Sequence, residues 1–256
     1  MANATHPSVA GLPALGDAAT AAVLELLTAR GALVGTYAVS HRTMHCWRTG
    51  MPLMYYAMES WFVRMSALRS ELTANNATVV WAPPAVGEHR FGHWLRGACD
   101  WALSRNRWWG TPLPVWKCAG CGHMHCVGSR EELTRLLAAV GAGAPTDLHR
   151  DALDPLKLMC AECGGEMVRE PYVLDCWFDS GCAPFAAQHY PFRGQAGPPT
   201  LVDFVAEGVD QTRGWFYTML ALSTALFGAP AYRSVLAVGL VLDAHGQKIA
   251  KAREHR

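Results

Sequence analysis

The chain has 256 residues, of which 51% are hydrophobic and 17% are charged, and these proportions are typical of a globular protein with one sizeable core and a smaller module. Its formal net charge of +1 excludes a general electrostatic attraction to nucleic acid, so any contact with RNA has to be local. No apolar run reaches the length of a membrane span and the first residues lack the pattern of a secretion signal, so we expect a cytoplasmic protein without membrane contact.

The first quarter of the chain predicts one helix and two short extended segments. Residues 1–16 resemble a flexible lead-in, and Asp17 is predicted to cap a helix that Gly31 ends. The apolar segments 33–39 and 52–58 flank a polar stretch, which indicates extended structure around a turn.

Three further elements are predicted before residue 117. Residues 61–75 have the pattern of a helix, and residues 78–81 that of a strand ending at Pro83. The region 90–105 is predicted to be partly helical.

The composition changes at Lys117, where small residues, cysteines and histidines replace an aromatic-rich pattern, and it changes back near Glu170. We therefore interpret 117–170 as an inserted module. Within it, Ser129 and Glu132 form the capping-box pattern that opens a short helix.

The last third alternates strand and helix patterns. Residues 203–208 and 234–243 are predicted strands, and 211–227 is a predicted helix that Gly228 ends. Strand, helix and strand with short links imply a right-handed parallel crossover, as in nucleotide-binding α/β domains.

The chain has nine cysteines, which in a reducing compartment are more often metal ligands than disulfides. Four of them form two CxxC pairs, each followed by glycine: Cys118, Cys121, Cys160 and Cys163. A two-residue gap lets both sulfurs of one turn reach the same ion, so we predict a structural Zn²⁺ site. Three nearby residues are possible substitute ligands, His123, His125 and Cys126. The alternative is four reduced cysteines without metal.

Four segments resemble, in order, sequence blocks of class I isoleucyl-tRNA synthetases: 100–116, 173–181, 203–223 and 239–252. The stretch 40–64 resembles the return of those enzymes from their editing insertion to the catalytic domain. The resemblance implies an α/β fold: a partial Rossmann-like class I synthetase catalytic domain, residues 17–116 and 171–256, with 117–170 as an inserted zinc-ribbon module.

The resemblance also implies an aminoacyl and adenosine site. Glu207 and Asp210 would hold the ribose, with Gly208 allowing close approach, and Gln211 would bind the polar groups of the amino acid. The isoleucine side chain would lie between Trp177 and Trp215, which sits four residues after Gln211 on one helix face. The alternatives are core tryptophans and carboxylates at a solvated helix start.

Two departures from the family pattern bear on the reaction. No HxGH motif occurs in the 256 residues, and this motif stabilises the ATP phosphates in the family. The family's KMSKS loop here runs from Lys248 to Ala252, so Lys248 and Lys251 remain as catalytic candidates while both serines are alanine. A solvated basic tail is the alternative.

The sequence therefore predicts an enzyme: an aminoacyltransferase that accepts an isoleucyl group from isoleucyl-tRNA or isoleucyl-adenylate and passes it to a small-molecule amine or amide in natural product biosynthesis, without ATP. The candidates for its general base are His189, His245, Asp175 and Asp179.

Two alternatives to this transferase stay open. One is a non-catalytic module that binds aminoacyl-tRNA or adenylate. The other is one piece of a split isoleucyl-tRNA synthetase, in which a partner subunit, or a second copy in a homodimer, covers an exposed sheet edge.

Overall fold

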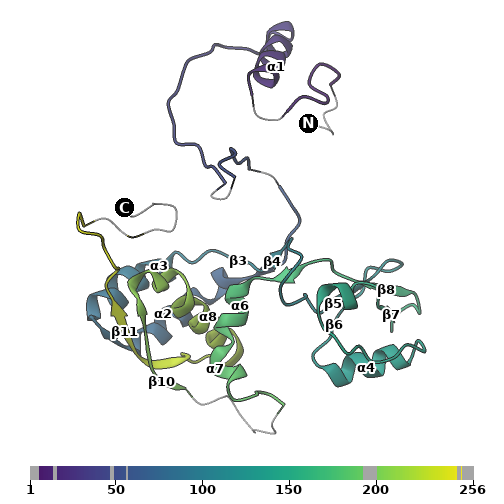
Figure 1. The fold of residues 1–256 in the computed structure, drawn as a ribbon, viewed down its shortest axis with the longest axis vertical. Helices are drawn as coiled ribbons and strands as arrows, with labels where there is room; N and C mark the ends of the chain where they lie inside the picture. Colours follow the sequence, from purple (N-terminus) through teal and green to yellow (C-terminus); the bar gives the residue numbers. More distant parts are fainter. Residues whose placement is uncertain are drawn as a thin grey trace. The chain divides into compact units, whose positions relative to one another are not determined.

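The computed structural model describes residues 6–13, 16–46, 49–55, 57–192, 201–246 and 249 of the chain. The chain divides into two units, Met1–Met58 with Ala250–Arg256, and Glu59–Ile249 (Figure 1). Within the described residues, no helix is long and apolar enough to cross a membrane.

In the first unit, helix α1 spans Asp17–Ala29. The prediction that Asp17 caps this helix is wrong by one residue, because the N-cap is Gly16, whose carbonyl accepts a hydrogen bond from Thr20 N at 3.2 Å. Asp17 lies in the first turn, where its charge faces the positive end of the helix dipole. Gly31, with φ at +64°, follows the end of the helix as predicted.

The two segments predicted to be extended form no regular β-strand among the described residues of this unit. An isolated antiparallel bridge joins His45 to Pro52, and Cys46 N donates to Met51 O at 2.8 Å. The chain thus turns where predicted, but pairing stops there because a lone two-stranded hairpin has too little apolar contact to extend.

The second unit contains a three-stranded parallel sheet in the order β10-β11-β2. Its strands are β2 (Val80–Ala82), β10 (Val202–Gly208) and β11 (Tyr232–Val238). Helix α8 (Trp215–Phe227) follows β10 and precedes β11. The parallel pairing of β10 with β11 matches the strand, helix and strand predicted from the sequence.

The two faces of this sheet differ in burial. Val205, Val235 and Trp81 form one row across the strands, and they pack with Phe216 and Met219 of α8 in the main core. These side chains are buried because α8 covers this face.

The opposite face of the sheet is apolar and exposed. Its alternate positions include Val80 at 69%, Phe204 at 58%, Val238 at 45% and Leu236 at 38% exposure. Parallel sheets are normally covered on both faces, so this face has the character of a contact surface.

The helix predicted for 61–75 begins later, as a 3₁₀ turn η1 (Met65–Leu68) followed by α2 (Arg69–Ala77). Its predicted first residues instead form strand β1 (Phe62–Val63), which pairs with β3 (Trp101–Ala102). Tertiary pairing therefore overrides the local helical pattern.

The predicted strand at 78–81 is present as β2, which begins two residues later and ends one residue later than predicted. A π-helical turn η2 (Val86–Phe91) and helix α3 (Gly92–Arg96) follow it. The partly helical region predicted at 90–105 thus ends at Arg96, and its last residues are in β3 and β4 (Ser104–Arg105).

A four-stranded antiparallel sheet has the order β6-β5-β8-β7. The strands are β5 (Val115–Cys118), β6 (Met124–Cys126), β7 (Lys157–Met159) and β8 (Glu166–Arg169). Helices α4 (Arg130–Ala138) and α5 (Arg150–Leu153) lie between β6 and β7 in the chain. Trp116, Leu133 and Leu137 form a separate small core here.

Helix α4 has the predicted start, because Ser129 is its N-cap and Ser129 Oγ accepts a hydrogen bond from Glu132 N at 3.1 Å. The reciprocal bond of the box is shifted by one residue, since Glu132 Oε2 accepts from Gly128 N at 2.7 Å.

After β8 the chain returns to the main core through β9 (Val173–Leu174), which pairs with β4. Helices α6 (Cys176–Gly181) and α7 (Ala183–Ala186) follow. Helix α6 packs closely on α8, since a Cβ on Gly181 would lie 2.9 Å from Leu222 Cδ1.

Candidate functional site

Two turns of the four-stranded sheet carry the paired cysteines. The β5–β6 turn holds one pair and the β7–β8 turn the other: Cys118 with Cys121, and Cys160 with Cys163. The two turns repeat one hydrogen-bond pattern, because Gly122 N donates to Cys118 O at 3.0 Å and Gly164 N donates to Cys160 O at 2.9 Å. Both glycines have positive φ, +75° and +70°, which favours glycine. The chain therefore forms two equivalent knuckles.

The four sulfurs of these knuckles all lie within 4.8 Å of one another. Sγ of Cys118 is 3.5 Å from Sγ of Cys163, and Sγ of Cys121 is 3.6 Å from Sγ of Cys160. Tetrahedral Zn–S bonds of about 2.3 Å place sulfurs about 3.8 Å apart. The donor set thus fits a tetrahedral metal ion.

The backbone also approaches the sulfurs closely. A Cβ on Gly165 would lie 3.2 Å from Sγ of Cys163 and 3.4 Å from Sγ of Cys118. Of the possible substitute ligands, His125 Nε2 bonds Glu132 Oε1 at 3.0 Å. Neither His125 nor the other two substitutes, His123 and Cys126, belongs to the cluster found among the described residues. Four cysteines can therefore hold an ion in a closed shell, which is the arrangement of a structural site.

The residues predicted to hold a ribose lie where β10 ends. Glu207 and Gly208 are its last two residues, and Asp210 follows in the 3₁₀ turn η3 (Val209–Arg213). A Cβ on Gly208 would lie 2.5 Å from Asp210 Oδ1, so glycine is needed for the carboxylate to reach this position. Glu207 is exposed. Ligand crevices of parallel sheets lie at this carboxyl end of the strands.

Gln211 and Trp215 are joined by a hydrogen bond, because Trp215 N donates to Gln211 Oε1 at 2.8 Å. The prediction that both lie on one helix face is wrong. Gln211 belongs to η3, and Gly214, with φ at −152°, interrupts the chain before α8 begins at Trp215. The amide of Gln211 therefore sits beside the first residue of the helix.

Trp177 of α6 also lies beside Gly214. A Cβ on Gly214 would lie 3.3 Å from Trp177 Cη2 and 2.4 Å from Gln211 Oε1. Trp215 Nε1 donates to Ser180 O of α6 at 2.9 Å. The structure therefore brings Trp177, Gln211 and Trp215 together around Gly214, and Trp177 is 40% exposed, unlike a core tryptophan.

Asp175 is one of the four residues considered as a general base, and its contacts are structural. It is buried, and it accepts hydrogen bonds from Trp101 Nε1 at 3.0 Å and Arg105 Nη2 at 2.5 Å. Asp175 also caps α6, since it accepts from Trp177 N. These contacts give the Asp175 carboxylate a structural role, because it holds Trp101, Arg105 and the start of α6.

The other three candidates for the general base, Asp179, His189 and His245, have different surroundings. Asp179 accepts a hydrogen bond from Thr111 Oγ1 at 3.0 Å, and burial, with the nearby charge of Asp175, raises its pKa. His189 lies in a turn with φ at +52°. His245 N donates to Asp243 Oδ1 at 2.9 Å in another turn.

The family model described as "tRNA synthetases class I (I, L, M and V)" matches residues 8–255.

The chain belongs to this family of class I tRNA synthetases.

Curated relatives within the family are isoleucine–tRNA ligases. The one from Thermus thermophilus is 46% identical over 237 residues, which are 92% of this chain and 22% of the relative. The one from Clostridium novyi is 46% identical over 235 residues, 90% of this chain and 22% of the relative. This synthetase-family chain therefore spans about a fifth of the length of the relatives it matches.

A solved structure is also similar, the ternary complex of Agrobacterium radiobacter K84 agnB2 LeuRS with tRNA and LeuAMS. Its TM-score is 0.40 at 20% identity, over 66% of this chain and 24% of that chain. The two lysines predicted from the synthetase loop pattern, Lys248 and Lys251, lie outside the described residues.

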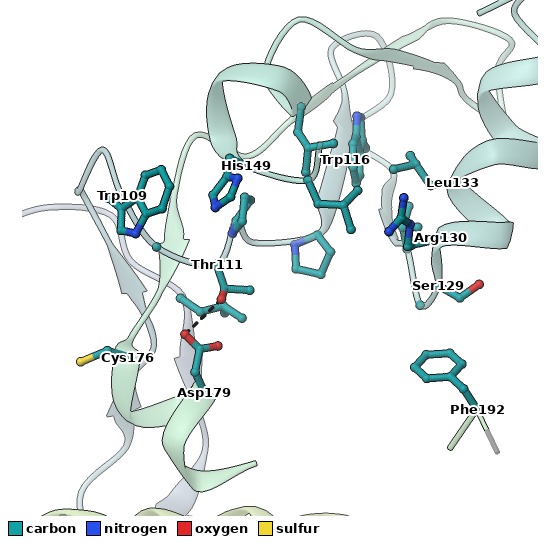
Figure 2. Close-up of a pocket in the computed structure, with 18 residues that line it drawn as sticks. Trp109, Thr111, Trp116, Ser129, Arg130, Leu133, His149, Cys176, Asp179 and Phe192 are labelled. Atoms are coloured by element: carbon teal, nitrogen blue, oxygen red, sulfur yellow. Dashed lines mark hydrogen bonds between the residues drawn. The ribbon is translucent and has the colours of Figure 1, made fainter. Parts of the chain in front are cut away.

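A cavity of about 750 Å³ lies beside α6 in this synthetase-family chain. Its walls come from α6, the α4 start and the loop before β5, with Trp109, Thr111, Arg130, His149 and Asp179 among the lining residues (Figure 2). Sequence reasoning did not find this cavity. The available signal was the pair of adjacent tryptophans, Trp108 and Trp109, in a loop.

Proposed function

We propose that this chain binds an isoleucyl-nucleoside, the part common to isoleucyl-adenylate and isoleucyl-tRNA, at the carboxyl end of β10. The observation that supports this is the meeting of Gln211, Trp177 and Trp215 around Gly214, next to Asp210. Gln211 Nε2 lies 3.4 Å from Asp210 Oδ2, so the aminoacyl and ribose parts of the proposed site adjoin.

The chemistry of these residues suits such a ligand. Two indoles can enclose a branched aliphatic side chain while burying a large apolar area. The carboxylates of Glu207 and Asp210 can accept hydrogen bonds from ribose hydroxyls at the strand end. The preference for isoleucine rests on the relatives, because a single methylene is typically worth only about 1 to 3 kcal/mol in a pocket.

The proposed reaction is transfer of the isoleucyl group from its ester or adenylate to an amine of a small-molecule acceptor, in natural product biosynthesis. A new C–N bond forms, the C–O bond to ribose or phosphate breaks, and the proton of the amine leaves with the released oxygen. The donor is already activated, so positioning supplies much of the acceleration. Alanine at both serine positions after Lys248 supports a reaction that needs no ATP.

The metal that we propose for the four cysteines is Zn²⁺ in a structural role. Zinc supplies folding energy here by tying two knuckles together. This assignment rests on the all-thiolate donor set and on sulfur separations near those of a tetrahedral site.

Binding is tested by calorimetry with isoleucyl sulfamoyl-adenosine, a nonhydrolysable mimic of the adenylate. We expect saturable binding that weakens at least tenfold in D210N and in W177A, with E166Q on the distant sheet as the matched control. Saturable binding that D210N and W177A leave unchanged, or no binding, overturns the proposed site.

Transfer is tested separately with radiolabelled isoleucyl-tRNA and a panel of amines. An amide product that D210N reduces supports transferase activity. Protection of the ester without product supports binding alone. Robust isoleucine-dependent exchange of pyrophosphate into ATP contradicts the ATP-independent reaction.

A second candidate function, one part of a larger synthetase, is favoured by the exposed apolar sheet face. Its residues Val80, Phe204, Leu236 and Val238 lie on the face that α8 leaves bare, and such faces require a cover. The test is co-expression with the remaining portion of a bacterial isoleucine–tRNA ligase. A stable complex that F204E disrupts and R233E leaves intact supports this candidate, and a monomer in every mixture contradicts it.

A further inference from the structure

The cavity beside α6 is separate from the residues proposed to hold the isoleucyl-nucleoside. Cys176 and Asp179 line the cavity, whereas Trp177 of the same helix lies against Gly214. Helix α6 therefore has one side on each site. The volume of about 750 Å³ is in the range of small-molecule sites in proteins, so the cavity is large enough for a second ligand.

Much of the wall of this cavity is apolar. Trp116, Leu133 and Leu153 line it, and all three are buried members of the small core of the cysteine-bearing sheet. Pro112 and Pro114, from the loop before β5, add further apolar surface. Side chains that a core already holds lose little freedom when a ligand contacts them. This part of the cavity therefore favours the apolar body of a ligand.

Asp179 is the only carboxylate among the described residues that line the cavity. Its Oδ2 accepts a hydrogen bond from Thr111 Oγ1 at 3.0 Å, and its other oxygen points into the cavity (Figure 2). Thr111 is fixed in turn, because its backbone O accepts from Leu174 N at 2.7 Å. The carboxylate is therefore held in one orientation, with one oxygen open to a ligand.

The surroundings of Asp179 favour a positively charged ligand. Within the described part of the chain, no basic side chain forms an ion pair with Asp179. Burial, together with the nearby like charge of Asp175, raises the pKa of the Asp179 carboxyl group. Both effects disfavour the carboxylate, and a cation placed beside it would offset them.

The basic side chains that line the cavity already have carboxylates near them. Arg130 lies across the cavity from Asp179 (Figure 2), in a first helical turn that also carries two glutamates. His149 Nδ1 lies 2.6 Å from Asp147 Oδ1. These groups are therefore not the missing partner of Asp179, and they offer little attraction to an anion.

An aromatic pair lies at the same end of the cavity as Asp179 (Figure 2). The rings of Trp109 and His149 stack with centroids 4.2 Å apart and planes 23° apart. The loop that carries Trp109 packs tightly, since a Cβ on Gly110 would lie 3.0 Å from Val173 Cγ2. Trp109 is nevertheless 73% exposed. An accessible indole face attracts organic cations, so it complements the carboxylate.

From these features we propose that the cavity binds an organic monoamine with a compact apolar body, of the arylalkylamine class. The ammonium group donates to the open oxygen of Asp179, near the indole of Trp109, and the apolar body fills the space beside Leu133 and Leu153. One carboxylate matches one positive charge, and Arg130 on the far side disfavours a second. This binding site does not depend on the proposed transfer reaction.

The probe is phenethylamine, a cation at neutral pH, titrated by calorimetry into the full chain. Two related compounds separate its charge from its apolar body. 2-Phenylethanol has a hydroxyl group in place of the ammonium on the same body, and methylamine keeps the charge without the ring. We expect phenethylamine to bind saturably and at least tenfold more tightly than either compound.

Two variants test the residues at the charged end. D179N should abolish the preference for phenethylamine over 2-phenylethanol, and W109A should weaken phenethylamine at least threefold. Both side chains are exposed, so both variants should fold. D151N is the matched control, because Asp151 is an exposed carboxylate of α5 that does not line the cavity, and it should leave all three affinities unchanged.

Equal affinities for phenethylamine and 2-phenylethanol overturn the proposal, and so does a preference that D179N retains. Absence of saturable binding at millimolar phenethylamine has the same meaning. D210N distinguishes this site from the proposed isoleucyl-nucleoside site, since it should leave phenethylamine binding unchanged. Loss of phenethylamine binding in D210N would place the amine at the other site and overturn the assignment to the cavity.

Discussion

Asp154 neutralises the guanidinium of Arg169, whose side chain is fully buried between the four-stranded sheet and the segment that returns to the main core. Arg169 Nη1 also donates to Leu113 O at 3.1 Å and to Tyr172 O at 2.9 Å. Arg150 Nε contributes a second cation, 3.0 Å from Asp154 Oδ2. This network fixes β8 where the chain leaves the cysteine-bearing sheet.

Replacing Asp154 by asparagine should destabilise the fold by about 2 to 3 kcal/mol, because it leaves a buried cation without its counter-charge. Urea unfolding measures the change. E166Q is the matched control, since Glu166 pairs with Lys157 at 2.9 Å on the exposed surface, where ion pairs contribute little. Equal effects of the two variants would contradict the role given to Asp154.

The ion pair of Asp154 with Arg169 predicts that the stability of the fold decreases at acidic pH. Burial raises the pKa of Asp154, but hydrogen bonds from Arg169 and Arg150 outweigh it, so the pKa is lowered. A lowered carboxyl pKa contributes stability that is present above its unfolded value, about 3.9, and that is lost as the pH falls through the folded value. The free energies of unfolding of the native chain and of D154N should therefore approach each other as the pH falls from 7 to 3. A difference between the two free energies that stays constant over this pH range would contradict the prediction.

Removing one cysteine of the cluster should release the metal. We expect C160S to lose bound zinc by mass spectrometry and to melt at a lower temperature, since a tetrahedral site with three thiolates no longer closes. C126S is the control, because Cys126 is a free and exposed thiol outside the cluster. Zinc retained at full occupancy in C160S would rule out the four-cysteine site.

Adding a methyl group at Gly214 should weaken the isoleucyl-nucleoside. Its Cβ would lie 2.4 Å from Gln211 Oε1, so the amide has to leave Trp215 N. G214A is expected to bind isoleucyl sulfamoyl-adenosine at least tenfold less tightly in calorimetry. G143A serves as the control, since a Cβ there meets nothing within 4 Å. Native affinity in G214A would mean that Gln211 does not position the ligand.

Local patterns predicted the elements whose signals are short-range. The capping residue Ser129, the strands around α8 and the two CxxC turns all follow from spacing and from glycine or hydroxyl chemistry at fixed positions. The cysteine cluster could be predicted as one site because each pair is a single turn, so only two pieces had to meet.

Features that depend on distant partners could not be read from the sequence. Phe62 and Val63 have a helical pattern but pair with Trp101 and Ala102. The place of Asp175 as a buried partner of Arg105 is set by strands β4 and β9, which lie far apart in the chain. Residue type made it a candidate base, and tertiary contacts gave it a structural role.

The position of α6 has a thermodynamic consequence. With only six residues, Cys176–Gly181, it forms a shared wall, and its close fit against Leu222 leaves it no room to move inward. A ligand that displaces α6 from one side would change the affinity for a ligand bound on its other side. Thermodynamic linkage requires each ligand to change the other's binding free energy by the same amount. A ligand in the cavity and isoleucyl sulfamoyl-adenosine would then report each other's occupancy, with either sign, through a helix of fewer than two turns.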